Sequence, residues 1–187
     1  MKKSATVYWL LPAKPERELF CSVIRILRKQ FGTPNFEPHL TLFVTTKDRS
    51  ASAKGQSNAS AARTSDPKKV LQNIKARPVR LSPRGVAFSE KFTKTLFVRF
   101  KSSPALRKLV SELGLAAKSS AKAPSDPHVS LLYKKLPRAA KKELAAVMRL
   151  PFRSVVFDSI AAVRSNLPVR TGADVRKWKI VAKKSLH

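Results

Sequence analysis

The apolar and polar positions up to residue 45 predict a strand, a helix and a second strand. Residues 6–11 form a short apolar run, which is typical of a buried strand. After Pro15, apolar residues recur at helical spacing, and Gly32 ends that pattern. Residues 39–45 are rich in aliphatic and β-branched side chains, so we expect a strand there.

Two further elements complete the first half of the chain, after a segment without periodicity. Residues 47–65 are rich in Ser, Ala, Lys and Gly and have no periodicity, which predicts a flexible surface loop or an insertion. The Asp-Pro pair at 66–67 is typical of a helix start, and a short helix is expected to follow it. Residues 79–88 predict a strand that Pro83 and Gly85 interrupt with a bulge or kink.

The second half of the chain repeats this order of elements. A strand precedes a helix that Ser103 caps and Gly114 ends, and a basic connection follows. The next helix is expected to bury Leu144, Val147 and Met148. The predicted ranges are strands at 95–100, 128–133, 152–163 and 178–182, and helices at 104–114 and 137–150.

One six-residue pattern occurs once in each half. Residues 37–42 and residues 126–131 both consist of an acidic residue, Pro, His, an aliphatic residue, a hydroxyl residue and Leu. A histidine placed two residues before Ser or Thr is common, and a single copy is more often structural than catalytic. Two copies with matching flanks, at matching places in a repeated order of elements, instead predict a duplicated site.

The two copies are expected to face each other. On a strand, side chains two positions apart share a face, so His39 projects with Thr41, and His128 projects with Ser130. Two similar halves pack naturally about an approximate two-fold axis, which brings the histidine faces across a groove. Each side of that groove then offers one imidazole and one hydroxyl.

Two opposed imidazoles suit the opening of a cyclic phosphate. This reaction needs a base that takes a proton from water and an acid that protonates the departing sugar oxygen, and histidine serves as either near neutral pH. The hydroxyls of Thr41 and Ser130 can donate hydrogen bonds to the non-bridging phosphate oxygens. Glu37 and Asp126 precede prolines and lack the spacing of metal ligands, so no metal is expected.

Several aromatic residues are candidates for substrate contact. Tyr133 follows the second motif and faces the groove only if the strand ends or bulges first, so phosphate contact, base contact and core packing stay open. Trp9 and Trp178 fit core or rim positions better than base stacking. Phe88 and Phe92 are open to both interpretations.

Composition adds a strong positive charge. Lys and Arg total 39 against 11 Asp and Glu, which gives a formal net charge of +28 on 187 residues. Such a field attracts nucleic acid and phosphorylated ligands, although basic residues spread over every predicted helix also serve solubility alone. Apolar residues make up 43% of the chain, enough for a sizeable core.

Cysteine usage and hydropathy indicate a cytoplasmic protein. Cys21 is the only cysteine, which excludes a disulfide within the chain and a cysteine-based zinc site, and we expect it to be buried and unreactive. The apolar run near the start is too short for a signal peptide, and no stretch is long enough to cross a membrane. We expect a monomer without a cofactor.

The residues His-Leu-Thr-Leu at 39–42 and His-Val-Ser-Leu at 128–131 resemble the paired signature of the 2H phosphoesterase superfamily. Segments similar to the plant- and yeast-type cyclic phosphodiesterases follow in the family's order over nearly the whole chain. The resemblance implies an α+β fold of duplicated β-α-β-α-β units, with antiparallel sheets lining a central groove and helices outside. It implies one bilobal domain over residues 1–187, with lobes at about 1–92 and about 93–187.

The resemblance also implies an activity. It implies metal-independent hydrolysis of ADP-ribose 1″,2″-cyclic phosphate or of nucleoside 2′,3′-cyclic phosphates, the latter to the 2′-phosphate. It makes His39 the base and His128 the acid, an order that the opposite substrate orientation reverses. It also assigns Thr41, Ser130 and Tyr133 to binding of the substrate phosphate. The long 47–65 segment and the charge depart from a compact nucleotide hydrolase. Two alternatives therefore stay open: an enzyme that opens cyclic phosphates on RNA ends, like the 2′-5′ RNA ligases, and a basic RNA-binding module without catalysis.

Overall fold

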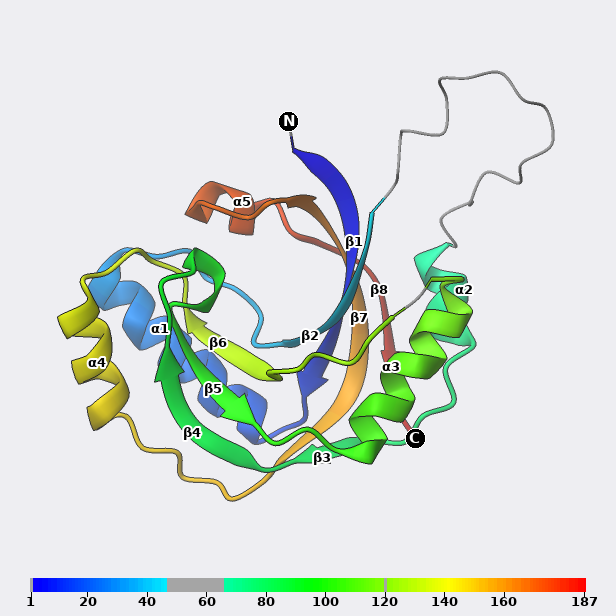
Figure 1. Ribbon diagram of the computed structural model, residues 1–187, viewed down its shortest axis with the longest axis horizontal. Helices are drawn as coiled ribbons and strands as arrows, with labels where there is room; N and C mark the ends of the chain where they lie inside the picture. Colours follow the sequence, from blue (N-terminus) through cyan, green and yellow to red (C-terminus); the bar gives the residue numbers. More distant parts are fainter. Residues whose placement is uncertain (1, 47–65, 120) are drawn as a thin grey trace.

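The computed structural model describes residues 2–46, 66–119 and 121–187, which form a curved antiparallel sheet with helices packed around it (Figure 1). The predicted α+β class is confirmed. The described strands are β1 (Lys3–Pro12), β2 (Leu40–Thr46), β3 (Val79–Leu81), β4 (Pro83–Phe88), β5 (Leu96–Phe100), β6 (His128–Leu132), β7 (Val155–Leu167) and β8 (Lys179–Ser185). The described helices are α1 (Glu16–Phe31), α2 (Pro67–Gln72), α3 (Pro104–Ala116), α4 (Arg138–Val147) and α5 (Gly172–Arg176), with a 3-10 turn η2 (Phe92–Lys94).

The helix starts and stops follow the capping residues of the sequence. Gly32 ends α1 in the left-handed region with φ 63°, where its N–H bonds to the carbonyl of Arg28. Asp66 accepts the N–H of Lys68 at the start of α2, and Ser103 accepts an N–H at the start of α3. These local signals were sufficient to locate three of the helices.

The strand predicted at residues 79–88 is two strands, at the two ends of the sheet. The strand order is β3-β7-β1-β2-β6-β5-β4, with β8 pairing with β7. Pro83 has no N–H to donate and Gly85 takes φ 120°, and the β4–β5 register shifts between these residues. Because only Ser82 separates β3 from β4, the sheet must curve until its two ends lie side by side, although it does not close (Figure 1).

The last two strands extend the sheet on one side of the first strand. β7 pairs along the whole of β1, and β8 pairs with β7 on the side away from β1. Strand pairing therefore does not follow the predicted succession of two halves, because β1 takes its second neighbour from the end of the chain. The lobe division at about residue 92 stays a prediction, and the loop expected at 47–65 lies outside the described residues.

Helix α4 differs from its prediction in the side chains that it buries. Val147 is 68% exposed because the helix ends there, so its predicted burial was wrong, while Leu144 and Met148 are half-buried. The fully buried residue is Lys141, whose Nζ donates to the Ser89 carbonyl at 3.2 Å and to the Glu90 carboxylate at 2.5 Å. Its charge is thus paired at the inner side of the helix.

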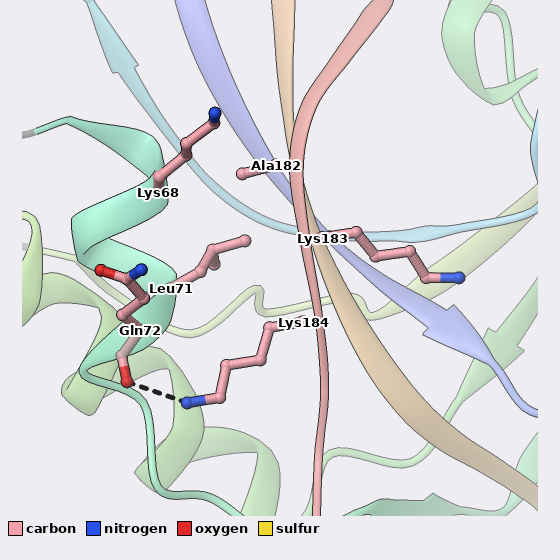
Figure 2. A pocket seen from close by; sticks show the side chains of 6 residues that line it. All are labelled: Lys68, Leu71, Gln72, Ala182, Lys183 and Lys184. Carbon is pink, nitrogen blue, oxygen red and sulfur yellow. Dashed lines mark hydrogen bonds between the residues drawn. The ribbon is translucent and has the colours of Figure 1, made fainter.

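Helix α2 is tied to β8 by a lysine (Figure 2). Lys184 Nζ donates to the carbonyls of Gln72 at 2.9 Å and Ile74 at 2.6 Å, which closes the end of the helix. A hollow of about 480 Å³ lies between the two elements, lined by Lys68, Leu71, Gln72, Ala182, Lys183 and Lys184. At least one lysine of this basic chain therefore stabilises the fold.

Within the described ranges, no helix combines the length and the apolar character that a membrane crossing needs.

Candidate active site

The two motif strands are neighbours in the sheet. β2 and β6 pair antiparallel through Leu40 and Val129, each of which directly follows the histidine of its motif. Both residues are fully buried in the core. Side chains alternate along a strand, so the histidines and the hydroxyl residues on either side of this pair project to the opposite face. We call them the motif quartet: His39, Thr41, His128 and Ser130.

The antiparallel register crosses the two motifs. Continued by one residue on either side of the Leu40–Val129 pair, it sets His39 opposite Ser130 and sets Thr41 opposite His128. The predicted juxtaposition of two imidazoles and two hydroxyls on one face thus follows from one pair of residues.

Both motif strands bulge directly after the hydroxyl residue. The β1–β2 register skips Leu42, and the β5–β6 register skips Leu131. A bulge reverses the alternation of side chains beyond it and bends the strand. Tyr133 therefore comes to the same side as the quartet, which is the condition that its position in the sequence required.

Each motif histidine is oriented by a backbone carbonyl two residues earlier. His39 Nδ1 lies 2.7 Å from the Glu37 oxygen, and His128 Nδ1 lies 2.8 Å from the Asp126 oxygen. A carbonyl can only accept, so each Nδ1 carries a proton and each neutral ring has its lone pair on Nε2. Within the described part of the chain, no hydrogen bond occupies either Nε2.

The acidic residues of the motifs form ion pairs next to the backbone carbonyls that orient the histidines. Glu37 pairs with Arg17 of α1, with 2.6 Å between Nε and Oε1. Asp126 pairs with Lys94 of η2 and with Arg99 of β5, the latter at 2.9 Å. Both carboxylates are thus bound by cations, which supports the carbonyls that orient the histidines.

His39 lies in an aromatic enclosure. Its ring stacks on Trp9 with 3.7 Å between centroids and 11° between planes, and Trp178 meets its edge at 5.6 Å. The pKa of His39 is lowered to about 4: burial is the largest cause, the charge of His128 also lowers it, and the hydrogen bond to the Glu37 carbonyl opposes both. The effect of His128 reflects the closeness of the two rings.

His128 lies in a more open and more charged setting. Phe97 meets its ring edge-on at 5.2 Å. Burial lowers the pKa of His128 below its ordinary value, the Asp126 carbonyl raises it, and the charges of Lys94 and Arg99 lower it. The negative charge of Asp126 raises the same pKa. Both rings are therefore neutral near pH 7 in the free protein, His39 more strongly so.

The two hydroxyls of the quartet differ. Ser130 is buried, and its Oγ donates to the Thr93 carbonyl at 3.0 Å. Thr41 is half-buried, and its hydroxyl bonds to none of the described residues. A ligand reaches the Thr41 hydroxyl without breaking a bond, whereas the Ser130 hydroxyl must turn away from Thr93.

Tyr133 joins an aromatic cluster next to the quartet. Its ring lies 4.2 Å from that of Phe36, 6.1 Å from that of Phe92 and 5.7 Å from that of Trp178. Burial raises the pKa of its phenol, and the nearby Ser130 hydroxyl lowers it. The phenol therefore stays protonated at neutral pH.

Sequence reasoning missed the role of the two tryptophans. Trp9 pairs with Thr41 across β1 and β2, and Trp178 reaches His39 from the segment between α5 and β8. Alternation along β1 could have placed Trp9 beside the motif face, but no local signal brings Trp178 there. Phe88 lies elsewhere, with Arg138 over its ring at 5.6 Å.

No metal ligands were expected at Glu37 and Asp126, the acidic residues of the two motifs. Among the side chains of the described ranges, no three of His, Cys, Asp and Glu gather closely enough to hold a metal ion.

Cys21, which was expected to be buried, is half-buried on α1, and burial raises the pKa of its thiol.

Comparisons with known proteins identify the family and similar folds. The family described as cyclic phosphodiesterase-like protein matches residues 4–186. The fold is similar to that of Escherichia coli LigT in its apo form, with a TM-score of 0.55, 15% identity, and 100% and 99% of the two chains covered.

A Thermus thermophilus protein, TT0787, is also similar, with a TM-score of 0.54, 19% identity, and coverage of 100% and 98%. LigT complexed with 3′-AMP gives 0.51 at 14% identity, with coverage of 99% and 98%. No curated protein matches this chain. The chain belongs to the cyclic phosphodiesterase-like family of the 2H phosphoesterases.

Proposed function

We propose that this protein hydrolyses a cyclic phosphate on ribose, with His39 and His128 as general base and general acid and without a metal. The observation that carries the proposal is the crossing of the two motifs at Leu40 and Val129. Its substrates are ADP-ribose 1″,2″-cyclic phosphate or nucleoside 2′,3′-cyclic phosphates. The LigT complex with 3′-AMP is a nucleotide complex of a protein with a similar fold, which supports a nucleotide ligand.

We assign the role of base to His39. A base must be neutral to accept a proton, and the pKa of about 4 keeps the His39 ring neutral over the physiological range. Its Nε2 takes a proton from water while the water oxygen bonds to phosphorus. For a nucleoside 2′,3′-cyclic phosphate, the bond from phosphorus to the 3′ oxygen breaks.

His128 then protonates the departing oxygen. The free ring is neutral, so it must gain its proton on binding, and the negative phosphate favours this by raising the pKa of the nearby imidazole. The products are the 2′-phosphate and a free 3′ hydroxyl. His39 finishes protonated and His128 neutral, and exchange with solvent resets both rings.

The hydroxyls of Thr41 and Ser130 donate to the non-bridging oxygens, where negative charge builds up in the transition state. Thr41 is free to do so, while Ser130 exchanges its bond to Thr93 for one to the phosphate. Tyr133 contacts the phosphate from the aromatic cluster, since its protonated phenol is a donor.

A second candidate is hydrolysis of the cyclic phosphate at an RNA end, which the charge of +28 favours. The third alternative is a non-catalytic RNA-binding module in which the histidines only hold a phosphate. We also keep a cytoplasmic monomer as part of the proposal. Light scattering of the purified protein and fractionation of cells check these two statements.

Phosphorus NMR tests the proposal. The protein is incubated, with EDTA present, with ADP-ribose 1″,2″-cyclic phosphate, the nucleoside 2′,3′-cyclic phosphates and a short cyclic-ended RNA. We expect a phosphomonoester resonance that grows with time, at the 2′ position for the nucleosides. Retention of RNA without product supports the binding module instead. Loss of turnover in EDTA that a divalent ion restores contradicts the metal-free mechanism.

A further inference from the structure

Helix α4 packs against β4 on the outside of the curved sheet, and it does so through a cation (Figure 1). Of the residues of α4, all of which the structure describes, only Lys141 is fully buried, with 2% of its side chain exposed. A buried charge costs free energy unless it is paired, and here the Ser89 carbonyl and the Glu90 carboxylate pair it. An apolar side chain often serves docking alone equally well, so this lysine points to a further role.

Both partners of Lys141 lie at the start of residues 89–95, the connection from β4 to β5. Ser89 closes this connection on itself. Its N–H donates to the Thr95 carbonyl at 3.3 Å, and its hydroxyl donates to the Lys94 carbonyl at 2.6 Å. Lys141 therefore holds the residue that joins the two ends of the connection.

The connection in turn holds the second motif. The Thr93 carbonyl accepts the Ser130 hydroxyl at 3.0 Å. Lys94 pairs with Asp126, and the Asp126 carbonyl orients His128. Among the described residues, hydrogen bonds and ion pairs join this connection to the second motif and none joins it to the first. A shift of the connection therefore acts on one half of the motif quartet.

We propose that Lys141 is a positioning residue, which acts through the β4–β5 connection on His128 and Ser130. This inference rests on the proposed function and adds to it a residue of an outer helix. The described hydrogen bonds of Lys141 go to Ser89 and Glu90, so it acts through other residues and not on the substrate. A misplacement of about 1 Å in a catalytic group costs up to about a hundred-fold in rate, so a tie of this kind governs turnover.

Lys141→Met tests the inference. Methionine keeps a long, flexible and apolar side chain but removes the ammonium group. We expect kcat on a cyclic phosphate to fall about ten-fold or more, and by a larger factor than KM rises, because the acid acts in the transition state. Thermal unfolding should change little, since Glu90 is 69% exposed and its carboxylate returns to water.

Lys142→Met is the matched control. It removes the same charge from the next position of α4, where the side chain is exposed, and should keep the kcat of the natural protein. Lys141→Arg keeps the cation at the buried position. It should therefore keep more of the rate than Lys141→Met, which a purely apolar docking role does not predict.

Glu90→Ala weakens the same tie without a change in the core. It leaves Lys141 with the Ser89 carbonyl as its described partner, and kcat should fall in the same direction. The double variant with Lys141→Met should lose less than the product of the two single losses, because both changes break one tie. If Lys141→Met does not fold, the Glu90 variant decides alone.

Histidine NMR separates this inference from the proposed function, because it needs no turnover. With isotope-labelled histidine, Lys141→Met and Glu90→Ala should shift the ring signals of His128 and leave those of His39 in place. Lys142→Met should leave both sets in place. These shifts in a protein that turns over no cyclic phosphate support the tie and contradict the proposed function.

Two results overturn the inference. One is a set of His128 ring signals that neither Lys141→Met nor Glu90→Ala changes. The other is a kcat that stays within about two-fold of the natural value in both variants, since a displaced general acid costs far more than that.

Discussion

His39 and His128 each give an Nδ1 proton to the carbonyl two residues earlier, yet their surroundings differ. His39 is 6% exposed and stacked on Trp9, while His128 lies closer to solvent and to charges. Equivalent residues of a duplicated motif can thus be given different acidities. At the scale of single residues, this difference is the physical basis of our division into base and acid.

Removal of either ring tests that both take part. His39→Ala and His128→Ala should each lower kcat by a factor on the order of a hundred or more, the usual contribution of general acid or base catalysis. Initial rates on a cyclic phosphate measure this, with circular dichroism to check the fold. His187→Ala, at the far end of the chain, should keep the natural rate. A rate loss below about three-fold in either motif variant contradicts the mechanism.

The pH profile tests the division of roles. The base must be neutral, so kcat/KM falls as pH drops toward about 4, the pKa of His39. The acid must be protonated, so kcat/KM falls as pH rises through the pKa of His128, which burial holds below its ordinary value. The maximum therefore lies on the acidic side of pH 6.5, the ordinary value for histidine.

Asp126→Asn should move the alkaline limb to lower pH, because the carboxylate raises the pKa of His128. Glu143→Gln, on the exposed side of α4, removes the same charge at a distance and should leave the limb in place. The idea fails if the Asp126 variant keeps the natural limb or moves it upward.

Burial of His39 also makes stability depend on pH. Its pKa falls from 6.5 to about 4 on folding, so the unfolded chain binds the proton first as pH drops. The corresponding stability is fully present above pH 6.5 and is lost as pH falls through about 4. The difference is about 3 kcal/mol of unfolding free energy.

Urea unfolding at pH 7 and at pH 4 measures this term. His39→Gln should lose less stability than the natural protein between these values, by up to about 3 kcal/mol. His187→Gln is the control and should follow the natural protein. The same loss in His39→Gln and in the natural protein would show that the ring is not buried as a neutral group.

At the scale of elements, the two motif strands share a bulge as well as a sequence. Leu42 and Leu131 hold the same place in the two motifs, and each is the residue that the register skips. Bulges re-aim the side chains that follow them, and here they turn the strands just past the quartet. The duplication is therefore visible in backbone geometry, which the letters alone do not reveal.

Helix α3 shows how a tertiary contact can outweigh local preference. Gly114 was expected to end the helix, but the helix continues to Ala116. A Cβ on Gly114 would lie 2.9 Å from the Ala121 Cβ and 3.0 Å from the Ser119 carbonyl oxygen. The glycine is needed for close approach of the returning chain, not as a stop.

Gly114→Ala should therefore destabilise the protein. Helix propensity alone favours Ala by about 1 kcal/mol, whereas overpacking against backbone costs about 1–3 kcal/mol, so the contact decides the sign. Thermal unfolding of the variant measures the change. Leu115→Ala, at a residue that is 79% exposed on the same helix, should have little effect. A rise in stability for Gly114→Ala would contradict the contact.

At the scale of the whole molecule, the curved sheet and the charge act together. β2 and β6 lie at the middle of the strand order, so the motif quartet lies at the centre of the curve (Figure 1). The chain carries 39 basic residues, and this excess of positive charge biases the protein toward anions.

Salt dependence distinguishes the two uses of this charge. Each phosphate contact to a single strand adds about 0.7 to the slope of log affinity against log salt. If the basic surface binds RNA, kcat/KM for a cyclic-ended oligonucleotide should fall more steeply with salt than for a cyclic mononucleotide. Equal slopes would indicate that the excess charge serves solubility alone. Initial rates between about 50 and 200 mM salt cover the useful range.

The sequence by itself determined most local structure and the identity of the motif quartet. Capping residues located α1, α2 and α3 because a cap acts within one turn of its helix. The faces of His39 and Thr41, and of His128 and Ser130, follow from strand alternation, which is also local. The repeat itself needed only the letters of the chain.

Tertiary structure alone decided which distant segments meet. It paired β7 with β1, separated β3 from β4, and brought Trp178 to the edge of His39. It also gave His39 its low pKa, since burial depends on everything that packs around the ring. Such contacts depend on packing interactions summed over the whole fold, and no short stretch of sequence contains all of these interactions.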